Sequence, residues 1–203
     1  MKKRKLRRKK GKEFDVKEQY KQVFAFLKES KIFIYAIIVI FFTFALIAFF
    51  VPVPESIIEQ IRKIIEELLK QTQGMSFSEL TGFIILNNVQ TSFLGMIFGI
   101  VLGIFPLLLA MSNGYLLGFV SKLSVNTDGF LSLWRLLPHG IFELPAVFIS
   151  LGLGMKIGSF LFQKKKLKSL KEYSLNSLKV FFFVVIPLLI IAGIIEGALM
   201  LIF

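Results

Sequence analysis

The feature that most constrains this chain is a run of twenty residues, 32–51, that carries no charged side chain. An α-helix rises about 1.5 Å per residue, so a helix of this length crosses the roughly 30 Å hydrocarbon core of a bilayer. Further apolar runs follow it, and 55 % of all residues are hydrophobic, against about 45–50 % in soluble domains. The sequence therefore predicts an all-α, polytopic helical membrane protein.

Positive charge is concentrated in two segments beside the apolar runs. Residues 2–12 carry nine Lys or Arg and no acid, and residues 164–179 carry six Lys and one Glu. In a soluble domain such basic patches are typical of nucleic-acid binding, but beside membrane spans the positive-inside rule explains them. We therefore expect no nucleic-acid partner, and we expect both segments, with the N-terminus, on the inner side of the cytoplasmic membrane.

The two basic segments also decide the number of spans. Within residues 81–123, the apolar stretch 93–120 could form one long helix, or residues 82–103 and 105–120 could form two spans with a tight turn at residues 103–106. Only two spans put both basic segments on one side of the membrane. A single membrane domain, residues 32–203, is then predicted to cross five times, and its spans are expected at residues 32–51, 82–103, 105–120, 140–162 and 180–203.

Two segments outside the spans have helical periodicity. After the basic tail, residues 14–31 match an amphipathic interfacial helix, although a solvated helix leading into the first span has the same pattern. These residues complete a cytoplasmic segment, 1–31. Residues 54–72 carry Ile and Leu at i, i+3, i+4, i+7 spacing opposite a charged face. We expect this second helix on the outer side, where it either caps the domain or offers a groove to a partner.

Small residues recur at every fourth position in three of the predicted spans. This spacing puts them on one helix face, where they let two backbones approach closely without a hydrophobic drive between the helices. They predict packing surfaces, within one protomer or between protomers. The glycines in these series are Gly95, Gly99, Gly103, Gly114, Gly118, Gly154 and Gly158.

Six polar residues fall within or at the ends of the predicted spans, where they are expected to face protein or water. They are Asn87, Asn88, Asn113, His139, Glu143 and Glu196. Three hypotheses remain open: a structural hydrogen-bond network around broken helices, a carrier or conduction site, and an intramembrane hydrolase or metal site. His139 and Glu143 share a face but supply only two metal ligands, and the chain has no cysteine. We expect no metal, no cofactor and no catalytic residue.

An ordered series of motifs from residue 81 to the C-terminus resembles the stage II sporulation protein M family. The series comprises Asn87-Asn88; Phe98-Gly99 with Gly103 and Pro106; Asn113-Gly114 with Gly118; Pro138-His139-Gly140; and Glu143-Leu144-Pro145-Ala146. The resemblance implies an integral membrane protein. For the namesake in spore formers it implies a scaffold for a peptidoglycan-degrading complex during engulfment, whereas many members occur in organisms that make no spores.

These observations favour a membrane scaffold without enzymatic activity of its own. Such a scaffold would organise protein partners, or further copies of itself, within the membrane lipid through its glycine faces and the outer amphipathic helix. The alternative is a permease- or channel-like component that handles a small solute or ion through the Asn, His and Glu cluster.

Overall fold

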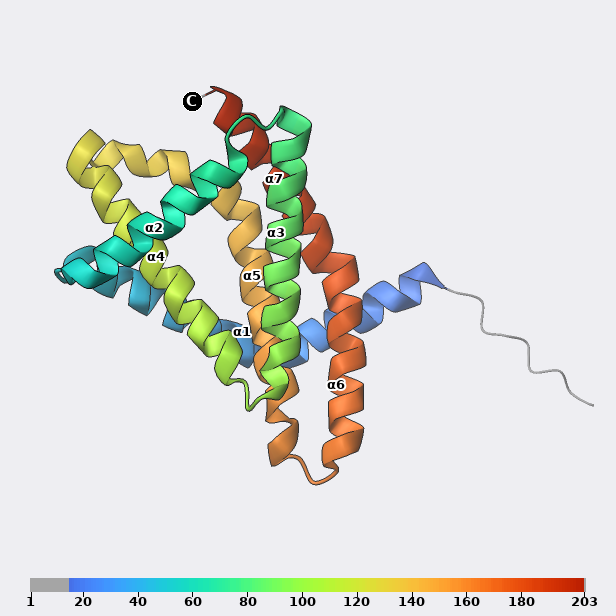
Figure 1. Cartoon of the computed structure of the whole chain (residues 1–203). Coiled ribbons are helices and arrows are strands. Elements are labelled where there is room, and N and C mark those ends of the chain that lie inside the picture. The colour runs from blue at the N-terminus through green and yellow to red at the C-terminus, as the bar shows by residue number, and fades with distance from the viewer. Residues whose placement is uncertain (1–14, 203) are drawn as a thin grey trace, which may run out of the picture.

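The computed structural model describes residues 15–202, with side chains throughout except at residues 135–139 and 200–202. All regular structure in this part of the chain is helical (Figure 1). Five helical segments are long and apolar enough to cross a membrane, which confirms the predicted all-α fold with five transmembrane helices. The α-helices are α1 (Val16–Phe50), α2 (Glu55–Thr72), α3 (Phe77–Ile97), α4 (Ile104–Asp128), α5 (Leu137–Gly158), α6 (Lys166–Val180) and α7 (Ile186–Ile202). The 3₁₀ segments η1 (Phe98–Ile100), η2 (Phe130–Leu136) and η3 (Ser159–Phe162) and the π-helical segment η4 (Phe181–Val185) join or extend them.

Helix α1 unites the amphipathic segment 14–31 and the first span, which the sequence treats as separate stretches. The Asp15 side chain accepts a hydrogen bond from the Lys17 backbone at 3.0 Å and caps the start. No Gly or Pro interrupts residues 16–50, so the helix continues until Pro52 and Pro54 end it. The charged half of α1 is thus the first part of a 35-residue helix.

Helices α3 and α4 are two spans joined by a tight turn, as the distribution of charge predicts. Glu79 closes the start of α3 by accepting hydrogen bonds from the backbone N–H of Ser76 at 2.8 Å and from its hydroxyl at 2.6 Å. The turn between the spans needs left-handed backbone at Leu102 (φ 55°) and Gly103 (φ 70°), the second of which suits glycine. Pro106 lies in the first turn of α4, where its missing N–H has no helical partner to lose.

The helix directions alternate as five successive crossings require. Helices α1 and α4 run parallel, since Gly114 packs on Phe41 and Gly118 on Ala45. Helices α3 and α5 are also parallel, whereas α7 runs against α3. The start of α1, the α3–α4 turn and the α5–α6 connection therefore lie toward one end of the bundle.

The helical segment that contains the fifth span begins well before the apolar run that starts at residue 180. The segment between the predicted spans 140–162 and 180–203 contains α6, which continues through η4 into α7. Leu170, Tyr173 and Leu178 pack against the main hydrophobic cluster, so α6 is held in place by tertiary contact. The π-helical turn lies just before Pro187, where the regular ladder cannot be completed because proline has no N–H.

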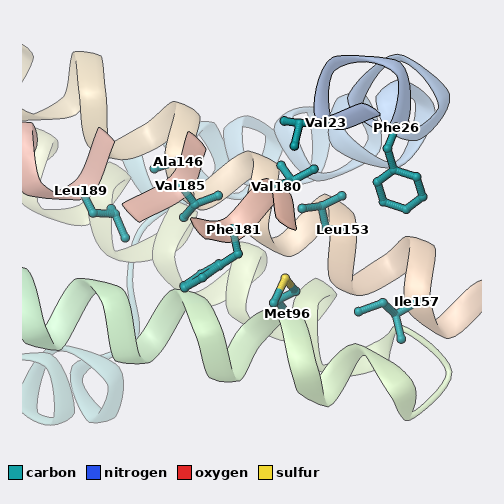
Figure 2. Packing of buried hydrophobic residues seen from close by; sticks show 10 residues of the cluster. All are labelled: Val23, Phe26, Met96, Ala146, Leu153, Ile157, Val180, Phe181, Val185 and Leu189. Atoms are coloured by element: carbon teal, nitrogen blue, oxygen red, sulfur yellow. The ribbon is translucent and has the colours of Figure 1, made fainter. Parts of the chain in front are cut away.

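Helix α5 is the central element of the bundle. In the most apolar 18-residue stretch of α5, 56 % of the residues are buried, against 17–33 % in the matching stretches of the other four spans. Figure 2 shows the main cluster, to which α5 contributes Leu153 and Ile157 beside Met96 of α3. Val23 and Phe26 of α1 close the cluster at the end where the chain enters the bundle.

Candidate functional site

The α3–α5 contact is a backbone-to-backbone packing of two glycine faces. A Cβ added at Gly99 would overlap the backbone of Gly154, and one added at Gly158 would overlap Gly99 and Gly103. Gly95 is the exception in this series, because its nearest neighbours are the side chains of Leu151 and Leu109. Small residues thus let α3 and α5 approach until their main chains touch.

A second glycine face holds α4 against α1. Gly114 lies against the carbonyl of Phe41 and Gly118 against that of Ala45, so a side chain at either position would overlap main chain. At the end of this contact the Lys122 ammonium donates to the Val51 carbonyl at 3.2 Å. The predicted glycine series therefore lie in contacts between helices of this same chain.

Two acidic residues lie on the neighbouring helices α5 and α7. Glu143 and Glu196 are both half-buried, and the charge of Glu196 acts on Glu143. On α3, the Thr81 hydroxyl packs against Gly197, the residue after Glu196, and is buried without a hydrogen-bond partner among the described residues. A charged carboxylate within a membrane span costs free energy unless it is paired or hydrogen-bonded. This end of the contact between α3, α5 and α7 is therefore a candidate functional site.

The other predicted polar residues are divided between regions. On α3, Asn87 is exposed and Asn88 is half-buried, on the face that also carries Thr81 and Ser92 by helical spacing. The Ser150 hydroxyl of α5 donates to the Ser92 carbonyl at 2.6 Å, so this face has a polar link to α5. Asn113 lines a cavity bounded by α1, α2 and α4. The His139 side chain lies outside the described residues.

A lysine that the sequence reading did not single out occupies an aromatic cage. The Lys156 ammonium lies 5.4 Å from the ring centre of Phe26, 5.8 Å from that of Phe33 and 4.9 Å from that of Tyr173. Its side chain is only 11 % exposed, and Glu29 lies 4.0 Å away. These distances are in the cation–π range. The cage joins α1, α5 and α6 at the end where α1 begins.

The sequence contains a signal that could have found this cage. Lys156 is the one charged residue between Glu143 and Lys164 in an otherwise apolar segment, and a lone charge there needs a partner. Gly152 was missed for another reason. It packs against Ile34 of α1, and it lies outside the four-residue series because it faces a different helix.

Comparison with known families agrees with this architecture. The sequence profile described as "Stage II sporulation protein M" matches residues 33–199, most of the chain. The chain belongs to the stage II sporulation protein M family. It is 29 % identical to the "Uncharacterized protein MJ0706" of Methanocaldococcus jannaschii over 198 residues, covering 92 % of this chain and 87 % of that one. No solved structure matches it.

The motifs behind the resemblance have physical roles in this stage II sporulation protein M family member. Gly99 and Gly103 form the α3–α5 contact and the turn that leads to Pro106. Gly114 and Gly118 form the α1–α4 contact. The Glu-Leu-Pro-Ala motif lies inside α5, where Ala146 is fully buried in the main cluster. Most of these motif residues therefore maintain packing, and Glu143 is the ionisable member with a described side chain.

Proposed function

We infer that this protein is a non-enzymatic scaffold of the cytoplasmic membrane that organises partner proteins through helix α2. The supporting observation is the apolar face of α2. Its second half leaves Ile65, Leu68 and Leu69 exposed, at 36 %, 44 % and 63 %, whereas the glycine faces are occupied by helices of the same chain. Exposed apolar helix faces mark interaction surfaces, and an apolar helix face of a partner fits such a surface.

The scaffold hypothesis is tested by charging this face. We expect the double substitution Leu68→Glu and Leu69→Glu to lower recovery of co-purifying proteins from native membranes by more than about 10-fold, since each charge would be desolvated in the contact. Glu59→Gln with Glu67→Gln, on the charged side of α2, is the matched control and should leave recovery unchanged. Equal recovery of the same partners by both variants would contradict the scaffold hypothesis.

We infer further that the start of α1 and the α5–α6 connection face the cytoplasm. The basic segment 164–179 follows α5 at this end and the basic segment 2–12 precedes α1 in the sequence, which is the charge distribution that the positive-inside rule predicts for the cytoplasmic side. The chain has no cysteine, so single-cysteine variants report position directly. Gln73→Cys should react with a membrane-impermeant maleimide in intact cells, and Lys165→Cys should react only after the membrane is opened. The reverse pattern would refute this orientation.

A second candidate function is the handling of a small solute or ion at the acidic pair. It is favoured by the electrostatic interaction of Glu143 with Glu196 beside the Thr81 hydroxyl, which has no hydrogen-bond partner among the described residues, because intramembrane carboxylates mark ion pathways. The test is flux through liposomes that contain the purified protein. Flux that Glu143→Gln abolishes would establish this function, whereas liposomes as tight as protein-free ones would leave the pair a structural role.

A further inference from the structure

The structure contains a cavity in a part of the molecule that neither the glycine faces nor the acidic pair involves. It is an open cavity with a volume of about 530 Å³ between α2 and α4, and Phe44 of α1 also lines it. In Figure 1, α2 crosses over α4 in this region. Ile57, Ile61 and Ile64 supply the α2 side. This volume is within the range of ligand pockets, roughly 300–1,000 Å³.

The mouth of the cavity has the character of a lipid-facing surface. Leu108 on the α4 side and Ile64 on the α2 side line the cavity and are 56 % and 52 % exposed. Because α1 and α4 are membrane spans, what surrounds this side of the protein is acyl chain rather than water. An apolar cavity that stays empty forgoes its dispersion contacts, so an acyl chain is the available occupant that restores them.

Two amides give the cavity a polar component. Asn113 of α4 and Gln60 of α2 both line it, and neither forms a side-chain hydrogen bond within the described part of the chain. Asn113 is half-buried in a membrane span, where an amide without a partner costs several kcal/mol. Neighbouring Ser112 is satisfied within its own helix, since its hydroxyl donates to the Leu108 carbonyl at 2.9 Å. The occupant therefore needs a hydrogen-bond acceptor as well as an apolar chain.

A glycerolipid has both features, because its acyl chain ends in an ester carbonyl. We propose that the cavity between α2 and α4 binds one acyl chain of a membrane glycerolipid, whose ester carbonyl accepts a hydrogen bond from Asn113 or Gln60. The bound chain fills the space under the first half of α2 and holds this helix against the spans. This site is independent of the scaffold role, which concerns Ile65, Leu68 and Leu69 of α2.

The test is the amount of lipid that the protein retains. The protein is reconstituted in vesicles of palmitoyl-oleoyl phosphatidylglycerol and phosphatidylethanolamine, extracted in mild detergent, washed, and examined by native mass spectrometry. We expect one retained phospholipid per chain. Met111→Trp, which fills the cavity from α4, should reduce retention at least about 10-fold, and Asn113→Leu should reduce it about 3- to 10-fold, the value of one neutral hydrogen bond.

A matched control and a measurement of folding distinguish loss of the lipid site from a general effect of the substitution. Leu46→Trp adds the same side chain on the exposed face of α1 and should retain lipid like the unmodified protein. Circular dichroism of each variant shows whether the helices are intact, and Asn113→Leu, which adds no bulk, tests the site if Met111→Trp does not fold. The proposal is overturned if the unmodified protein retains no phospholipid, if it retains a second copy of the chain instead, or if folded cavity variants retain as much lipid as the control.

Discussion

The two sides of helix α4 are packed in opposite ways. On one side Gly114 and Gly118 bring its backbone against carbonyls of α1 and leave no room for a methyl group. On the other side Asn113 and Leu108 face a cavity of about 530 Å³ beneath α2. Lipid is as apolar as a leucine side chain, so helices in a membrane associate through close packing rather than a hydrophobic drive. Small residues therefore mark the contacts in which backbones touch, which we call fixed contacts. The large apolar residues of α2 form a loosely packed contact that leaves space beneath the helix.

The largest expected difference between a variant and its matched control comes from adding a methyl group to the fixed contact. Gly99→Ala should destabilise the protein by about 1–3 kcal/mol or more, because the new Cβ would overlap the backbone of Gly154. Unfolding in SDS titrations, followed by circular dichroism, measures the change. Gly82→Ala is the matched control in the same helix, since nothing lies within 4 Å of its Cβ position. It should be neutral or stabilise by up to about 1 kcal/mol, and equal losses for both variants would refute the distinction.

The difference between close and loose packing can be tested by truncating one side chain in the main cluster and one beside the cavity. Leu153 of α5 is fully buried, so Leu153→Ala should reduce the free energy of unfolding by about 2–5 kcal/mol. Ile61 of α2 is 8 % exposed but borders the cavity, so it has fewer contacts to lose, and Ile61→Ala should cost about 1 kcal/mol or less. The same titration measures both. A loss at Ile61 as large as that at Leu153 would mean that α2 is packed as firmly as α5.

The smallest expected effect concerns the aromatic cage, which adds a charged contact to the firmly packed helix α5. Lys156→Met keeps the length of the side chain but removes the ammonium from the rings of Phe26 and Tyr173. We expect a loss of about 1 kcal/mol in the free energy of unfolding. Lys156→Arg should retain most of the stability, because a guanidinium also stacks on aromatic rings. If both variants lose the same amount, the shape of the lysine matters rather than its charge.

The number of spans and their helical type could be predicted from the sequence because they depend on local chemistry. The length of an apolar run sets the length of a span, and the two basic segments require an even number of crossings between them. The break between α3 and α4 follows from Gly103 and Pro106, which suit a left-handed turn and a first helical turn. The family could likewise be identified from the order of these small and polar motifs.

The partners of each face could not be predicted, because they depend on which helix approaches. The spacing of Gly154 and Gly158 reveals a face but not that α3 lies against it. Asn113 and Glu143 are both polar residues within membrane spans, and their separation into two regions follows only from the packing of α4 and α5. The continuity of α1 was hidden because charges in residues 16–31 resemble a surface segment, although nothing in its backbone chemistry ends the helix there.

The parallel contact of α1 with α4 has a consequence for how the protein is made. Helix α1 leaves the ribosome first, yet the glycines that receive it, Gly114 and Gly118, follow much later in the chain. Because the turn at residues 101–103 is short, we expect α3 and α4 to enter the membrane as a hairpin. We therefore expect α1 to lie in the bilayer without its contact to α4 until this hairpin is inserted. A chain interrupted before residue 118 would lack this contact of the first helix.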